Sequence, residues 1–464
     1  MIFSSILFLF IFLPITLFIY YLSPKKIKNF ILLIASLIFY AWGEPTYVIL
    51  MLFTIVFNYY MALVIESNKR KRKLALIITI AIDILILGFF KYFGLLVDTI
   101  NSIFSLSIES PKLSLPVGIS FYTFQTLSYV IDVYIKQVKV QKSLIDFGAY
   151  IAMFPQLVAG PIVKYSDIEK DLTKRKINMD NFGRGVERFI LGLGKKVLIA
   201  NNVGMIWESI QSRDLGSISV IASWIGIIAY TLQIYFDFSG YSDMAIGLGK
   251  MLGFNFMENF NYPYIATSIT DFWRRWHISL SSWFRDYVYI PLGGNRCKIS
   301  RQCINLLIVW SLTGLWHGAS YNFIMWGLYY GVLLIFEKFI FKKILDKLPK
   351  LIRWLYSIIL VMIGWVFFAS SNLSWAIDYL KIMFGGTSNS FIDSSTSYYL
   401  STNWVLLVIA IIIATPLLSK IFDYIKKQKE GGMLLAIIIQ MAILIVSIAY
   451  LVNASYNPFL YFRF

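Results

Sequence analysis

The chain has 464 residues, of which 58% are apolar and only 14% are charged, and its formal net charge is +17. A soluble domain of this length does not need so much apolar surface, so the composition excludes a soluble enzyme and is typical of a multi-pass membrane protein. The Lys and Arg residues fall in short clusters between hydrophobic runs. This pattern indicates cytoplasmic loops facing a lipid bilayer, and we expect no nucleic-acid partner.

Hydrophobic runs predict about 11 to 12 transmembrane helices in an all-α integral membrane protein. The expected crossings are 5–23, 29–43, 46–65, 74–97, 116–135, 186–206, 218–238, 304–320, 321–340, 353–370, 403–420 and 433–452. The stretch 144–162 ends in Met-Phe-Pro-Gln-Leu-Val-Ala-Gly-Pro-Ile. Its two prolines and its glycine favour a re-entrant segment over a simple crossing.

The distribution of positive charge predicts the orientation. Loops 24–28, 69–73, 136–143, 341–353 and 420–429 hold twenty Lys and Arg residues, whereas the alternate loops hold three. Positively charged loops stay in the cytoplasm, so we expect both termini on the extracytoplasmic side of the cell membrane. We find no linker or separate soluble domain, and the sequence predicts one membrane domain over 1–464.

The stretch 239–303 is neither apolar enough to span nor polar enough to be a free domain. Trp273, Trp276 and His277 have the spacing of one helix face, which predicts an amphipathic helix at the membrane interface with its aromatic side chains in the lipid. The glycines of 291–296 predict a tight turn.

Three carboxylates occur within or beside hydrophobic runs. We expect Asp237 and Asp243 to pair with arginines of 274–296, because membrane carboxylates usually have partners; a catalytic role is the alternative. Asp83 is expected to bond a neighbouring helix.

The chain contains only two histidines, His277 and His317, and both lie where an ionisable side chain is costly. Such residues are candidates for function, and imidazole is well matched to proton transfer near neutral pH. The alternative is a structural histidine that bonds a neighbouring helix.

Several long motifs resemble those of bacterial membrane-bound O-acyltransferases, and most of all the branch of alginate and peptidoglycan O-acetyltransferases. The motifs are Asp-Phe-Trp-Arg-Arg-Trp-His-Ile-Ser-Leu from Asp271, Gln-Ile-Tyr-Phe-Asp-Phe-Ser-Gly-Tyr-Ser-Asp from Gln233, Met-Phe-Pro-Gln-Leu-Val-Ala-Gly-Pro from Met153, and Leu-Thr-Gly-Leu-Trp-His-Gly from Leu312. The resemblance covers nearly the full chain. It implies a helical fold around a central tunnel.

The resemblance also implies site residues. His317 matches the essential histidine of the family, and His277 matches a second histidine near the cytoplasmic side. Tyr461 lies in an aromatic tail similar to one whose tyrosine is proposed to carry the acyl group; an interfacial anchor is the alternative.

Candidates for donor binding lie in the motif around His277. Arg274, Arg275 and Arg285 are suited to hold phosphates of a nucleotide-containing thioester, with Trp276 beside them. Simple anchoring at the cytoplasmic surface is the other explanation for these arginines. No permanently bound cofactor or metal is expected.

The resemblance thus implies an enzyme that moves acetyl from cytoplasmic acetyl-CoA across the membrane to O-acetylate an extracytoplasmic polysaccharide. The chain has no Gly-x-Ser-x-Gly elbow, so an extracytoplasmic transferase of the esterase-like type is the expected partner. Two alternatives remain at this point. One is D-alanyl transfer to teichoic acid from a carrier-protein thioester, and the other is a transporter for acyl groups or glycans without covalent chemistry.

Overall fold

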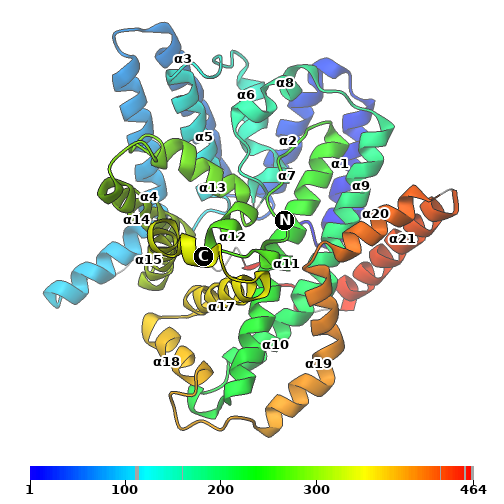
Figure 1. The fold of residues 1–464 in the computed structure, drawn as a ribbon. Coiled ribbons are helices and arrows are strands. Elements are labelled where there is room, and N and C mark those ends of the chain that lie inside the picture. Colours follow the sequence, from blue (N-terminus) through cyan, green and yellow to red (C-terminus); the bar gives the residue numbers. More distant parts are fainter. Residues whose placement is uncertain (110–113, 159, 429, 454–455, 461–464) are drawn as a thin grey trace. The chain divides into compact units, whose positions relative to one another are not determined.

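The structure, a computed structural model, describes residues 1–109, 114–158, 160–428, 430–453 and 456–460. Within these ranges all regular elements are helices (Figure 1). Eight helices of the described part are long and apolar enough to cross a membrane. They are α3 Val48–Ser67, α4 Arg72–Phe104, the continuous helix Met179–Gln211, α11 Val220–Leu252, Tyr321–Leu345, α17 Lys350–Ala369, α19 Ser394–Ile413, and Gly431–Asn453 of α21. The expected all-helical membrane protein is confirmed.

Four further predicted crossings coincide with helices that are shorter or less apolar. These are Phe8–Leu22, which includes α1 Leu13–Leu22, then α2 Lys28–Ala41, α5 Ile119–Tyr134 and α14 Ile299–His317. The other α-helices are α6 Leu144–Ala152, α7 Phe154–Leu157, α8 Tyr165–Lys174, α12 Ile269–Arg275, α13 Ile278–Phe284, α18 Leu373–Met383 and α20 Leu417–Lys427. The helix is interrupted at Met153, as the prolines near it predict. A re-entrant position of this segment in the membrane stays a prediction.

Several helices extend beyond the hydrophobic runs that predicted them, and two of them do so through polar segments. The run 186–206 belongs to the helix Met179–Gln211, and the run 218–238 continues to Leu252 in α11. The sequence interpretation was wrong here because polar residues lower the apolar content of these helix ends. The end of α11 is nevertheless buried: Asp243, for example, is 6% exposed and lies 2.6 Å from the guanidinium of Arg188. The start of the helix Met179–Gln211 is exposed, as at Met179.

The chain forms two compact units, each with its own set of packed helices. One contains Met1–Phe189 and Tyr241–Glu258, and the other contains Ile190–Gly240 and Asn259–Phe464. The chain passes between the units three times: within the helix Met179–Gln211, within α11, and in the loop between Glu258 and Asn259.

The first unit is held partly by a buried polar contact among three helices. Asp83 of α4 accepts hydrogen bonds from Asn58 of α3 at 2.9 Å and from Thr126 of α5 at 3.0 Å. All three side chains are 2% exposed or less. The expectation that Asp83 bonds neighbouring helices is confirmed, and the carboxylate is satisfied as buried polar groups require.

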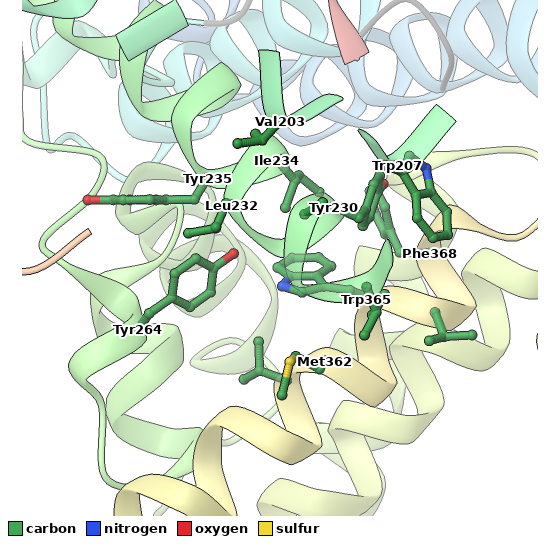
Figure 2. Packing of buried hydrophobic residues seen from close by; sticks show 14 of the residues in the cluster. Val203, Trp207, Tyr230, Leu232, Ile234, Tyr235, Tyr264, Met362, Trp365 and Phe368 are labelled. Atoms are coloured by element: carbon green, nitrogen blue, oxygen red, sulfur yellow. The ribbon is translucent and has the colours of Figure 1, made fainter. Parts of the chain in front are cut away.

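The second unit has an aromatic core that extends over several helices. Figure 2 shows Met362, Trp365 and Phe368 on one side of α17, directed toward Tyr230 and Ile234 of α11. The spacing of three residues places the α17 side chains on one face of the helix.

Helices α14 and α15, Tyr321–Phe336, approach each other closely through glycines. A Cβ on Gly314 would lie 2.3 Å from the carbonyl oxygen of Phe323, and one on Gly327 would lie 2.2 Å from that of Trp310. Small residues permit such helix contacts in membranes. The contact fixes the end of α14, where His317 is the last helical residue.

Candidate functional site

The segment that carries His277 is two short helices rather than one. Helix α12 runs from Ile269 to Arg275 and α13 from Ile278 to Phe284, and the backbone of His277 between them is left-handed with φ 44°. The prediction of one continuous amphipathic helix was therefore wrong. A left-handed residue cannot continue a right-handed helix, and it is uncommon for a residue with a Cβ.

The break at His277 is stabilised by Asn259. The backbone carbonyl of Asn259 accepts from the N–H of Ile278 at 2.9 Å, and its side-chain oxygen accepts from the N–H of Ser279 at 3.1 Å and from its hydroxyl at 2.9 Å. These bonds satisfy donors at the start of α13 that have no partner within the helix. Asn259 thus holds the ring of His277 in place through the backbone beside it.

The aromatic residues of α12 are buried in protein, not directed into lipid. Trp273 is 6% exposed and its ring lies 4.6 Å from that of Trp310 of α14, while Trp276 is 4% exposed and lies 4.8 Å from Trp365 of α17. The prediction that these aromatic side chains lie in the lipid was therefore wrong. These rings gain more from packing on other rings than from lipid, which offers no comparable geometry.

Glu337 anchors the start of α12 and was missed from the sequence. Its two carboxylate oxygens accept from the backbone N–H groups of Ile269 at 2.6 Å and Thr270 at 2.8 Å. A carboxylate at a helix N-terminus is stabilised by the free N–H groups and by the helix dipole. The available signal was a glutamate just after the apolar run 321–336.

The rings of both histidines pack against one tryptophan. The ring of Trp316 is 5.9 Å from that of His277 and 4.8 Å from that of His317, and both contacts are edge-on. The imidazole of His317 also packs edge-on against Trp326 at 4.9 Å and Phe368 at 5.1 Å. The fold therefore brings together the two histidines that the sequence singled out, and surrounds them with apolar rings that exclude water.

A cavity of about 340 Å³ lies next to His317, although the histidine itself is not part of its lining. Its lining includes Gly318, which follows the histidine, and Phe368, whose ring touches the imidazole. Gln211 of α10 Asn201–Gln211, Ser370 and Leu460 line other parts of its wall. This mixture of apolar rings and a few polar groups is typical of a small-molecule or peptide site.

The other histidine is held neutral by its surroundings. His277 is 3% exposed, and burial lowers its pKa to about 3 because the charged imidazolium loses its hydration. Its Nδ1 atom is buried without a hydrogen-bond partner in the described part of the chain. At the pH of a cell this side chain is thus an uncharged imidazole with a free nitrogen.

Acid is expected to destabilise the fold through His277. In the unfolded chain its pKa is about 6.5, so between pH 6.5 and 3 the unfolded state binds a proton that the folded protein does not. This contribution to stability is complete above about pH 6.5 and is lost as the pH falls toward 3. From pH 6.5 to 5.0 the loss is about 2 kcal/mol. Thermal unfolding in detergent at both values should show it, and His277→Gln should show a smaller loss; equal losses would contradict the assignment.

The predicted donor-binding residues differ in what they contact. Arg275 forms an ion pair with Asp271 at 2.9 Å, and Arg285 pairs with the adjacent Asp286 at 2.8 Å. Arg274 is exposed, whereas Trp276 is part of the aromatic core. The arginines lie on α12 and at the end of α13, and Arg274 and Arg285 are both exposed.

The structure also tests the predicted turn after α13 and the predicted partners of Asp237 and Asp243. Gly293 and Gly294 have φ values of 110° and 52°, which confirms the predicted tight turn. The expected pairing of Asp237 with arginines of 274–296 is wrong: Asp237 lies 2.6 Å from Lys196. The ion pair of Asp243 is likewise with Arg188, because these partners face it from the adjacent long helix.

Tyr461 lies outside the described residues, but the tail just before it is described. Phe459 and Leu460 are 5% and 2% exposed. The backbone N–H of Leu460 donates to Asp237 at 2.8 Å. The tail therefore enters the protein at the cavity beside His317.

Comparison with known proteins identifies the family. A profile of the membrane-bound O-acyltransferase family matches residues 137–372. The chain belongs to the membrane-bound O-acyltransferase family. This range contains both histidines, α12 and the aromatic core around them, so the match covers the site whose geometry is described above.

Relatives of this membrane-bound O-acyltransferase cover most of its length. The probable alginate O-acetylases of Pseudomonas aeruginosa and Pseudomonas putida are 44% and 40% identical, over 83% and 100% of this chain and 75% and 100% of their own. The peptidoglycan O-acetyltransferase of Helicobacter pylori is 35% identical over 100% of this chain and 98% of its own. The chain is thus an acyltransferase of the membrane, and the transporter alternative is set aside.

Proposed function

We propose that this acyltransferase takes acetyl from cytoplasmic acetyl-CoA and delivers it for O-acetylation of an extracytoplasmic polysaccharide. The relatives named for alginate and peptidoglycan O-acetylation support the acetyl group and the polysaccharide class. The observation that carries the proposal is the buried His317 beside a cavity that also receives the C-terminal tail. A base, an acceptor segment and a water-poor surrounding are the parts that acyl transfer from a thioester requires.

In this proposal His317 is the general base and Tyr461 is the first acceptor. The tyrosine oxygen bonds to the acetyl carbon, the carbon–sulfur bond breaks, and His317 passes the phenol proton to the departing thiolate. The C-terminal end of α14 carries partial negative charge, which stabilises the imidazolium in between. An esterase-like transferase outside the cell then moves acetyl from Tyr461 to a sugar hydroxyl.

His277 and the arginines are assigned to the donor. The free Nδ1 of His277 is suited to hydrogen-bond the donor without competing for the proton, because this imidazole stays neutral. Arg274, supported by Arg275 and Arg285, is suited to hold the phosphates of coenzyme A, whereas the buried Trp276 shapes the wall behind them.

The donor is testable with the purified protein in lipid vesicles. We expect radiolabelled acetyl-CoA to transfer label to the chain, and a D-alanyl carrier-protein thioester to transfer none. The two donors differ in whether nucleotide phosphates are present for the arginines to bind. Label from the D-alanyl carrier alone would favour the teichoic acid alternative.

The direction of transfer depends on the proposed orientation, with both termini extracytoplasmic. In a chain with Cys297 and Cys303 replaced by serine, a cysteine at the exposed Ser390 should react with an impermeant maleimide on whole cells. A cysteine at the exposed Ser67, next to the basic loop 69–73, should react only after the membrane is opened. The reverse labelling would overturn the orientation.

A further inference from the structure

A buried ion pair in the second unit holds the C-terminal segment 457–460. Lys196 and Asp237 are 2.6 Å apart, and their side chains are 2% and 1% exposed. Lys196 lies in the π-helical turn Lys195–Ala200 of the helix Met179–Gln211, and Asp237 lies in α11. Burying two charges is expensive, so such a pair persists only where further hydrogen bonds complete it.

The further hydrogen bonds come from the backbone of the tail. The ammonium of Lys196 donates to the carbonyl oxygen of Pro458, and the second carboxylate oxygen of Asp237 accepts from the N–H of Leu460 at 2.8 Å. The cation thus meets a backbone acceptor and the anion meets a backbone donor two residues later. The two bonds together fix the position of residues 458–460 along the ion pair.

Side chains around the pair strengthen this attachment. The amide of Asn201 donates to the side-chain oxygen of Asn457 at 3.1 Å, and the ring of Phe459 lies 6.5 Å from that of Phe238. The ammonium of Lys196 is 6.0 Å from the ring centre of Phe459, within the range of a cation–π contact. π-Helical turns are often found at functional sites, and here the turn places Lys196 at the tail.

We propose that Lys196 and Asp237 are positioning residues that clamp the C-terminal segment so that its end is presented to the cavity beside His317. Leu460, the residue whose N–H is held, lines that cavity. The importance of the clamp for transfer rests on the proposed function of the tail, whereas the attachment itself does not. Both residues act through the tail and neither is assigned to the reacting atoms.

The sharpest test exchanges the two charges. The double variant Lys196→Asp with Asp237→Lys retains an ion pair between the same helices but places a carboxylate at the Pro458 carbonyl and an ammonium at the Leu460 N–H. If the pair only joins helices, this variant behaves as the wild type. If it is a clamp, the tail is released.

Release of the tail is measured by carboxypeptidase Y on the full-length protein in detergent, with the released residues quantified by mass spectrometry. We expect Leu460 and Phe459 to be released at least tenfold faster from the exchanged variant than from the wild type, and acetyl transfer to fall at least tenfold. Unchanged protection of Leu460 in a folded exchanged variant would overturn the proposal. A loss of transfer without faster release would also overturn it.

Two further variant sets keep the test decisive if the exchange disturbs folding. Leu460→Pro removes the N–H that Asp237 accepts and leaves the ion pair intact, whereas the matched Leu460→Ala keeps the N–H. We expect faster hydrogen exchange of the Phe459 N–H only in the proline variant. The double variant Arg188→Met with Asp243→Leu removes an ion pair between the same two long helices away from the tail, and should leave the tail protected. Equal exchange in Leu460→Pro and Leu460→Ala would contradict the clamp. Faster release of the tail from the Arg188→Met, Asp243→Leu variant would contradict it as well.

The clamp and the transfer of acetyl through Tyr461 can be tested separately. If Tyr461→Phe transfers acetyl normally while the exchanged variant still releases the tail, the clamp stands and the relay through Tyr461 fails. If Tyr461→Phe is inactive and the exchanged variant keeps its tail protected and active, the relay stands and the clamp fails.

Discussion

His317→Ala is expected to abolish acetyl transfer, with a loss of at least 100-fold in rate. Removal of a general base costs about 10²–10⁴-fold, and the other histidine, His277, is a poor proton acceptor because burial lowers its pKa to about 3. The measurement is transfer of label from acetyl-CoA by the purified variant in lipid vesicles. Transfer at the wild-type rate would exclude His317 as the base.

A packing defect must be distinguished from a loss of chemistry, because His317 contacts Trp326 and Phe368. Trp310→Phe is a suitable control, since Trp310 belongs to the same aromatic core and packs on Trp273. We expect this control to lose some thermal stability but to keep transfer within a few-fold. His317→Ala should unfold at a similar temperature and yet be inactive.

Tyr461→Phe is expected to eliminate transfer to the polysaccharide. The change removes the one hydroxyl that can accept acetyl and keeps the aromatic ring, so an anchoring tail would tolerate it. In the wild type, mass spectrometry of the C-terminal peptide after incubation with labelled acetyl-CoA should find acetyl on Tyr461. A fully active Tyr461→Phe variant would leave His317 acting on an acceptor that enters from outside.

Tyr456→Phe is the matched control for this prediction. Tyr456 belongs to the same tail, five residues before Tyr461, and its hydroxyl is close to Gly204 of α10. Removal of this hydroxyl should leave transfer within a few-fold of the wild type. Comparable losses in both variants would mean that the tail is sensitive to any substitution, and that acetyl need not pass through Tyr461.

Apolar runs were sufficient to predict the helical architecture. Each expected crossing coincides with a helix, because a membrane helix is specified by local apolar content over its own length. The motifs were likewise sufficient to place the chain in its family and to single out His317. Its position at the end of α14 follows from the extended Gly318 after it.

The partners of the buried charges were decided by tertiary structure alone. Lys196 and Asp237 lie 41 positions apart and meet the tail more than 220 positions later, as the bond from Leu460 to Asp237 shows. Periodicity within one helix contains no information about which helix lies opposite. The same limit explains why arginines close in sequence were expected to pair with Asp237, and why Glu337 was missed at the start of α12.

At His277, the sequence predicted the importance of the residue, whereas tertiary structure decided its backbone conformation. Its sequence indicated that the imidazole matters, since an ionisable group among apolar residues needs a reason to be there. Only the fold decided that the helix breaks at this residue, because Asn259 caps α13 from a distant loop and the aromatic rings of four helices enclose the segment. The sequence by itself determined the helices, the family and the candidate base, because these depend on local composition and motifs. Tertiary structure decided the break, the ion-pair partners and the entry of the tail, because each requires groups from separate helices to meet in a buried space where they must satisfy one another.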